Sequence, residues 1–166
     1  MSNESPVVSV IVGSASDEAA LVPCRKALDA FALPYEARVL SAHRTPAELV
    51  EYVTGLEGRG LKVVIAAAGM AAALPGAVAA HTRLPVLGVP LAAGSLQGVD
   101  ALLSVAQMPG GVPVGCMGVG PAGGKNAAYL AARILAVSDE KVRVRLLEVI
   151  EEDKQKVLNS SLSWEY

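Results

Sequence analysis

The sequence predicts an α/β fold: a three-layer, doubly wound parallel sheet of the flavodoxin-like kind, with a long C-terminal helix. Short runs rich in Val and Ile alternate along the chain with segments of helical periodicity, which is the order of elements in such a sheet. Each run is apolar almost throughout, as a strand buried on both faces requires. The chain has 166 residues, 52% of them hydrophobic, and this is enough for one domain with a substantial core.

Five strands are expected in this sheet: Val7–Val12, Tyr35–Leu40, Val63–Ala67, Pro85–Val89 and Val112–Val119. The expected helices between and after them are Glu18–Phe31, Pro46–Leu56, Leu74–His81, Val99–Ala106 and Lys125–Ala136. Pro23 conflicts with the first helix, because a proline beyond the first turn removes a hydrogen bond and clashes with the preceding turn. We therefore expect that helix to begin late or to bend.

The C-terminal stretch, residues 138–159, places Val142, Leu146, Ile150 and Val157 at helical spacing between charged residues. This pattern predicts one long amphipathic helix. Two interpretations stay open: the helix closes the core of its own domain, or it reaches onto a neighbouring subunit. We expect one domain over residues 1–166, with its core at about 7–137 and this helix at about 138–159.

Composition and charge exclude several classes of protein. A formal net charge of −2 argues against a surface that binds nucleic acid through its backbone. Cys24 and Cys116 lie far apart without ligand spacing, so neither a disulfide framework nor a metal site is indicated. The apolar runs are too short and too often broken to cross a membrane, and the N-terminus lacks a basic targeting region. These features predict a cytoplasmic protein.

In open α/β sheets, ligands bind where the carboxyl ends of the strands turn into helices. After the first strand, Gly13 allows close backbone approach, and Ser14 and Ser16 offer hydroxyls near free helix N–H groups that suit a phosphate or a ribose. Asp17 is a candidate acceptor for ribose hydroxyls. The alternative is an ordinary N-cap, in which Ser16 or Asp17 satisfies backbone donors.

The turn after the second strand carries the strongest candidate for chemistry. It reads Ser41-Ala42-His43-Arg44-Thr45-Pro46, and Pro46 is well placed to begin a helix. A phosphate held by Arg44 would lie beside His43, whose imidazole can take and return a proton near neutral pH. The alternative is a solvated loop histidine with a structural arginine.

Small residues dominate the later turns. Gly69, Met70, Ala73 and Leu74 follow the third strand, where backbone amides could contact a flat ring or a carboxylate. The segments 90–98 and 107–111 are either parts of the site, the second as a flap over the ligand, or plain connections.

Two features are expected to be structural. The run 118–123 matches GxGxxG, but it follows the last strand, whereas a dinucleotide fingerprint belongs to a first βαβ unit. His81 ends a short helix, where the helix dipole stabilises a cation.

Four motifs, in this order, resemble the PurE family of purine biosynthesis over about residues 7–137. They are Gly13-Ser14-Ala15-Ser16-Asp17, Ser41-Ala42-His43-Arg44-Thr45-Pro46, Leu74-Pro75-Gly76 and Gln107-Met108-Pro109-Gly110-Gly111. The resemblance implies a homo-octamer that converts N5-carboxyaminoimidazole ribonucleotide into 4-carboxyaminoimidazole ribonucleotide without metal or organic cofactor. It implies that carbon dioxide is an intermediate held in the pocket.

By the same resemblance, His43 is the general acid and base. Ser14, Asp17 and Arg44 match residues of the family that bind the ribonucleotide, with Ser16 and Ser41 beside them.

The chain departs from the family at one segment. Members of the bacterial mutase class resemble GAGGAAHLPG after the third strand, whereas this chain has Met70 in place of a glycine and Ala73 in place of a histidine. Met70 with Leu74-Pro75 is also similar to the PurE-like domain of the carboxylase that makes the nickel-pincer cofactor from a pyridine nucleotide. The alternatives are thus a divergent carboxylase or decarboxylase of a related azole or pyridine nucleotide, or a catalytically dead nucleotide-binding subunit.

Overall fold

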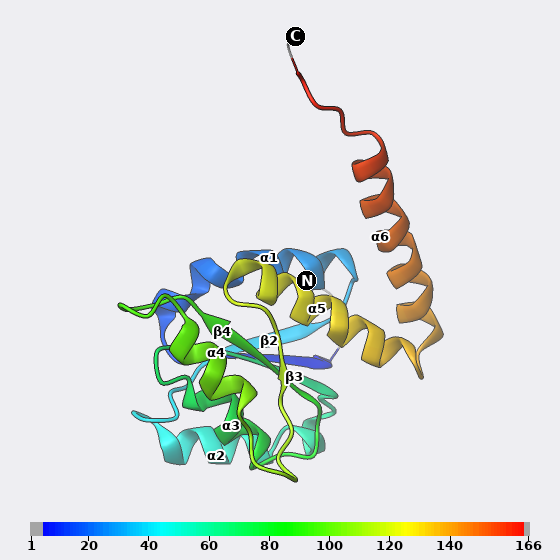
Figure 1. Ribbon diagram of the computed structural model, residues 1–166. Helices are drawn as coiled ribbons and strands as arrows, with labels where there is room; N and C mark the ends of the chain where they lie inside the picture. Colours follow the sequence, from blue (N-terminus) through cyan, green and yellow to red (C-terminus); the bar gives the residue numbers. More distant parts are fainter. Residues whose placement is uncertain (1–4, 165–166) are drawn as a thin grey trace.

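A computed structural model describes residues 5–164 of the protein (Figure 1). Its sheet has five strands in the order β2-β1-β3-β4-β5, and every neighbouring pair is parallel. The strands are β1 (Val8–Val12), β2 (Tyr35–Val39), β3 (Val63–Gly69), β4 (Val86–Leu91) and β5 (Gly115–Cys116). This strand order is that of the flavodoxin-like fold, so the predicted fold class is confirmed.

Helices cover both faces of the sheet. They are α1 (Glu18–Ala30), α2 (Pro46–Thr54), α3 (Ala73–Ala79), α4 (Val99–Ala106), α5 (Pro121–Ala136) and α6 (Glu140–Leu158), with short 3₁₀ turns η1 (Ala15–Asp17) and η2 (Glu57–Arg59). Val8, Val10 and Val12 pack against α1 and α5, whereas Ile11 packs with the helices α2, α3 and α4 of the other face. Successive side chains of β1 thus point to two apolar layers in turn, which explains why the strand sequences are apolar almost throughout.

The last strand is much shorter than expected. Only Gly115–Cys116 pairs with β4, and the prediction of a strand over Val112–Val119 is wrong. Pro113 and Pro90 lack N–H groups for a longer ladder. Beyond Cys116 the backbone turns at Gly118 to pack against α5, where a Cβ on Gly123 would lie 1.6 Å from the Gly118 carbonyl oxygen.

Two helix boundaries also differ from expectation. α1 begins at Glu18, the first residue of the expected range, and contains Pro23 in its interior, so of the two alternatives, a late start or a bend, the late start is wrong. The carbonyl that Pro23 leaves without a donor belongs to Ala19, which is exposed and accessible to water. α5 begins at Pro121, earlier than the expected Lys125, because proline suits the first helical turn and Gly124 allows close packing on Leu21 of α1.

The long C-terminal helix forms as predicted and packs against α5 through its first half. Leu146 and Val149 are buried in the core that contains α1 and α5, which supports the interpretation that the helix closes its own domain. Its second half leads away from the domain (Figure 1). Within residues 5–164, no helix is both long enough and apolar enough to cross a membrane.

Candidate active site at the carboxyl edge of the sheet

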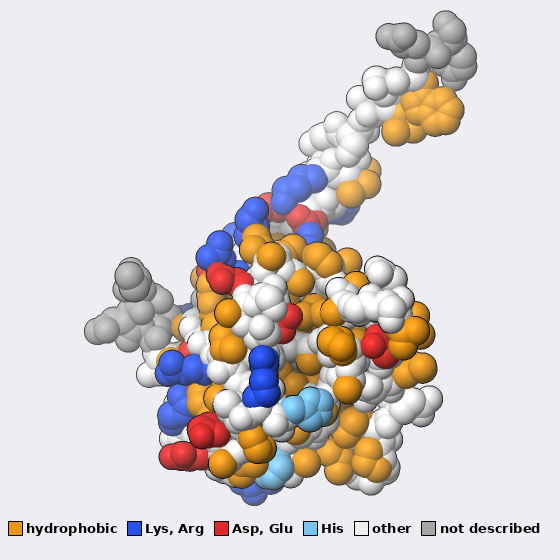
Figure 2. Space-filling view, turned by 90° about the vertical axis from the view of Figure 1, so that its left-hand side faces the viewer, with side chains coloured by type: hydrophobic (Ala, Val, Ile, Leu, Met, Phe, Trp, Pro, Cys, Tyr) orange, Lys and Arg blue, Asp and Glu red, His pale blue; other side chains and the backbone are white. Residues whose placement is uncertain are grey.

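The turns that follow β1, β2, β3 and β4 meet at one edge of the sheet. β1 and β3 are neighbours, yet the helices that follow them cover opposite faces. Their carboxyl ends are therefore the switch point at which sheets of this kind bind ligands, and we call this region the crevice. Figure 2 looks onto this edge and shows a histidine beside a Lys or Arg side chain, surrounded by hydrophobic ones. The arrangement is suited to a small ligand with an anionic group and an apolar ring.

The turn after β1 is ordered by a capping box. The Ser14 N–H donates to Oδ2 of Asp17 at 3.1 Å, and the Ser14 Oγ accepts from the N–H of Ser16 at 3.3 Å and from its hydroxyl at 2.8 Å. The N-cap alternative is therefore confirmed for Asp17, which accepts from a backbone N–H, and wrong for Ser16, because Ser14 is the capping residue. Capping also holds all three polar side chains at the mouth of the crevice.

The turn after β2 is held by its own side chains. Thr45 Oγ1 accepts from the Ser41 N–H at 2.9 Å and donates to the Ser41 carbonyl at 3.2 Å. The Ser41 hydroxyl accepts from the backbone N–H of Arg44 at 3.2 Å. His43 lies in the middle of this turn and is exposed, so its ring can reach a bound molecule.

Arg44 joins the two turns. Its Nη2 donates to the Gly13 carbonyl at 2.5 Å, and its Nε donates to the Ser41 hydroxyl at 3.4 Å. Partial burial raises the pKa of Asp17, whereas the Ser14 N–H and the charge of Arg44 oppose that rise. A cation, a carboxylate and several hydroxyls are thus brought together from segments that lie some 30 residues apart in the chain.

The turn after β3 is built for close backbone approach. A Cβ on Gly69 would lie 2.9 Å from the Ala93 Cβ and 3.2 Å from the Leu91 carbonyl oxygen, so only glycine fits there. Met70 and Ala72 have positive φ angles of 55° and 34°, a conformation that strains any residue other than glycine. The Met70 side chain is 60% exposed and stands at the edge of the crevice.

The predicted site residues after β3 differ in what they present. Ala73 is half-buried at the first position of α3, whereas the Leu74 side chain is buried in the core. Leu74 can therefore offer only its backbone to a ligand. Ala42 is half-buried and packs against the core on the side of α2.

The segment after β4 belongs to this edge, although the predicted site residues did not include it. Ala93 lies against Gly69, and a Cβ on Gly94 would lie 3.8 Å from Met70 Cγ. The sequence feature that points to this segment is its run of small residues at the end of a strand, where ligands bind in such sheets. The segment 107–111 instead follows α4 and precedes the amino end of β5, and the Met108 sulfur packs against Gly76 of α3. Within one chain this segment connects α4 to β5, so the structure favours the connection of the two alternatives.

The two features expected to be structural have visible structural roles. Gly123 allows the backbone of α5 to contact Gly118, as described above. His81 is exposed, and its Nδ1 lies 2.8 Å from the Ala77 carbonyl oxygen at the end of α3.

The comparisons with known proteins agree on one family. The family described as AIR carboxylase matches residues 7–156. The N5-carboxyaminoimidazole ribonucleotide mutase of Bacillus subtilis is 50% identical over 156 residues, which cover 94% of this chain and 96% of that protein. The protein of the same name from Pseudomonas aeruginosa is 48% identical, again over 94% and 96%.

A solved structure extends the likeness to three dimensions. The crystal structure of Treponema denticola PurE superimposes with a TM-score of 0.83 and is 29% identical, covering 92% of this chain and 94% of that one. The motifs that resembled PurE lie together at the carboxyl edge, except for the segment after α4. The chain belongs to the AIR carboxylase family.

Proposed function

We propose that the protein interconverts N5-carboxyaminoimidazole ribonucleotide and 4-carboxyaminoimidazole ribonucleotide in purine biosynthesis, with His43 as the general acid and base. The observation that carries the proposal is the position of His43, exposed in a turn whose next residue, Arg44, is bonded to the turn after β1. The names of the two mutases described above support the reaction and its substrate.

The crevice divides the binding of the nucleotide between its polar groups. Arg44, with the hydroxyls of Ser14, Ser16 and Ser41, holds the phosphate through charge-assisted hydrogen bonds. Asp17 accepts hydrogen bonds from the ribose hydroxyls. The base then lies toward Gly69 and Met70, where small residues let the backbone approach a flat ring.

The proton transfers fall to His43. The imidazolium gives its proton to the carbamate nitrogen as the N–C bond breaks, which releases carbon dioxide and aminoimidazole ribonucleotide inside the crevice. Carbon 4 of the ring then attacks the carbon dioxide and forms the new C–C bond. The neutral His43 removes the proton from carbon 4, so the histidine returns to its starting state and no net proton is exchanged.

Ala73 and Met70 make a second function worth testing. Ala73 cannot hydrogen-bond to a carboxylate or to carbon dioxide, and Met70 occupies space at the mouth of the crevice. If a second polar group is needed to retain carbon dioxide, the protein acts as a slow decarboxylase that releases aminoimidazole ribonucleotide. We favour the mutase, because loss of a supporting group usually costs less than loss of the acid–base group itself.

The deciding experiment supplies the carbamate substrate to the wild type and to a Met70→Gly, Ala73→His double variant. Both the 4-carboxy product and free aminoimidazole ribonucleotide are followed against a buffer blank. We expect 4-carboxy product from the wild type and more of it from the double variant. If neither protein forms product above the buffer rate, the mutase proposal is wrong, and free aminoimidazole ribonucleotide as the main product would identify a decarboxylase.

We also propose a homo-octamer, as the resemblance to PurE implies. Val99 and Leu103 lie one turn apart on α4, and Leu96 lies just before this helix. Each is more than half exposed, as expected for a face covered by another subunit. Light scattering should give a mass near eight subunits. A stable monomer at micromolar concentration would exclude the proposal.

A further inference from the structure

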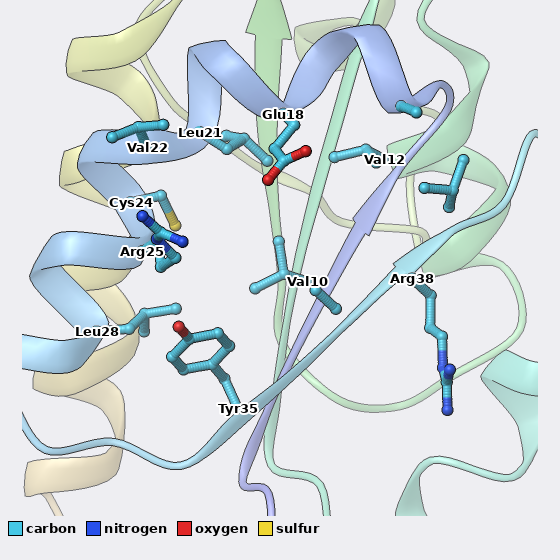
Figure 3. Close-up of a pocket in the computed structure, with 13 residues that line it drawn as sticks. Val10, Val12, Glu18, Leu21, Val22, Cys24, Arg25, Leu28, Tyr35 and Arg38 are labelled. Atoms are coloured by element: carbon cyan, nitrogen blue, oxygen red, sulfur yellow. The ribbon is translucent and has the colours of Figure 1, made fainter. Parts of the chain in front are cut away.

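A hollow lies between α1 and the edge strand β2, beside the turn after β1 (Figure 3). Its volume is about 280 Å³, and its lining is mostly apolar, with Val10, Val12, Leu21, Leu28, Tyr35 and Ala37. Figure 3 shows Tyr35 beneath Leu28 and Cys24 in the gap between the helix and the strand. We call this hollow the edge groove.

The edge groove exists because the sheet extends beyond the helices that cover it. Among residues 5–164, β2 pairs only with β1, so no described strand lies at its other edge. Tyr35, Ala37 and Val39 are in register with Val8, Val10 and Val12, so they project to the face that carries α1. Val39 remains 57% exposed. Such an edge is a template for an added strand, and the exposed apolar side chains beside it favour an apolar one.

The same chain carries a segment with matching chemistry. We call residues 154–164 the arm, and every residue of it is exposed. At its end, Ser161-Leu162-Ser163-Trp164 alternates polar and apolar residues as a half-buried strand does. Leu162 is 78% exposed and Trp164 is 70% exposed. Five extended residues, 160–164, span about 17 Å, the length of the five-residue β2.

The arm is directed away from the edge groove of its own chain. α6 is anchored to the domain by Arg145, whose Nε donates to the Ala30 carbonyl at 2.7 Å. Asp153 accepts from the Tyr129 hydroxyl and pairs with Lys125 at 3.3 Å. Beyond Asp153 the chain leads outward in both views (Figures 1 and 2). A second copy of the chain can offer its groove to an arm held in this way.

We propose that the arm binds the edge groove of a second copy of this chain, adding residues 160–164 as a strand beside β2. Leu162 and Trp164 then enter the groove, and Arg25, which borders it, can stack on the indole. The proposal deepens the self-association proposed above by naming which surfaces meet. None of the proposed site residues lines the groove, although Ala15, which lies between Ser14 and Ser16, does.

Trp164 is the only tryptophan in the chain, so its fluorescence reports the environment of the arm. In the full-length wild type at micromolar concentration we expect blue-shifted emission that iodide quenches poorly. Ala37→Arg fills the edge groove with a charge, and Val39→Lys does the same at its end; both positions are exposed, so folding should survive. Each should shift the emission to longer wavelength and make it accessible to iodide. Ala80→Arg, a matched change at an exposed alanine beyond α3, should leave it unchanged.

A mixing experiment decides whether the groove belongs to another chain. Ala37→Arg subunits, which keep Trp164, are refolded together with Trp164→Phe subunits, which keep an open groove. Recovery of blue-shifted emission in the mixture supports the proposal. Lack of recovery indicates binding within one chain and overturns it.

Light scattering on the same samples separates this proposal from the proposed octamer. An octamer whose Trp164 is already exposed to iodide in the wild type overturns the arm proposal and leaves the octamer standing. A wild-type monomer overturns both.

Discussion

The two halves of the carboxyl edge differ in how they are built. The turns after β1 and β2 are polar and are tied together by side-chain hydrogen bonds, above all that of Arg44 to the Gly13 carbonyl. The turns after β3 and β4 are made of small residues that touch through Cβ atoms and backbone, as Gly69 and Ala93 do. The first half can supply charge and protons, whereas the second, over residues 70–72 and 92–98, has no ionisable side chain and supplies mainly shape and backbone amides. The departures from the mutase pattern, Met70 and Ala73, both lie in the second half.

This contrast predicts that changes in the first half alter chemistry and binding, whereas changes in the second alter fit and stability. The largest expected effect is that of His43→Asn, which keeps polarity but cannot exchange protons. Turnover should fall by roughly 100-fold or more while nucleotide binding survives. Initial rates measure turnover, and calorimetry measures nucleotide binding. His81→Asn, at the only other histidine, should keep full activity, and an active His43→Asn variant would remove His43 from the mechanism.

Arg44→Ala tests whether the first half also provides the anchor. Loss of a charge-assisted phosphate contact should weaken nucleotide binding by at least about 1.5 kcal/mol, roughly tenfold. Calorimetry checks this against Arg83→Ala, which removes an exposed arginine paired with Glu57 away from the site. An unchanged dissociation constant in Arg44→Ala would place the phosphate elsewhere.

The smallest expected effect concerns Met70 and sharpens the contrast in the second half. A φ of 55° destabilises the folded state by about 1 kcal/mol or more when the residue has a side chain, as Met70 does, but not when it is glycine. The greater conformational freedom of glycine in the unfolded chain partly offsets this difference. Met70→Gly should therefore raise the free energy of unfolding by about 0.5 kcal/mol, as measured in urea.

Ala71→Gly is the matched control, because Ala71 is not among the residues with positive φ. It should lower the free energy of unfolding by a similar amount. If both variants lose stability, the turn after β3 is not strained at Met70.

Sequence patterns alone were sufficient for the fold class, for the strands β1 to β4 within two residues at each end, and for the polar turns after β1 and β2. These features depend on signals between near neighbours: apolar runs, helical spacing, and hydroxyl and proline residues at helix starts. They also sufficed for the resemblance to PurE, which the family match confirms.

Only the tertiary structure decided the rest, because it depends on contacts between distant segments. The length of β5 is limited by the partner strand it meets, and the segment 107–111 packs on α3 through Met108 and Gly76. The bond of Arg44 to Gly13 crosses 31 residues. The positive φ of Met70 and the edge groove beside β2 likewise follow from packing, since neither a side-chain pattern nor a helix cap encodes the space that neighbouring elements leave open.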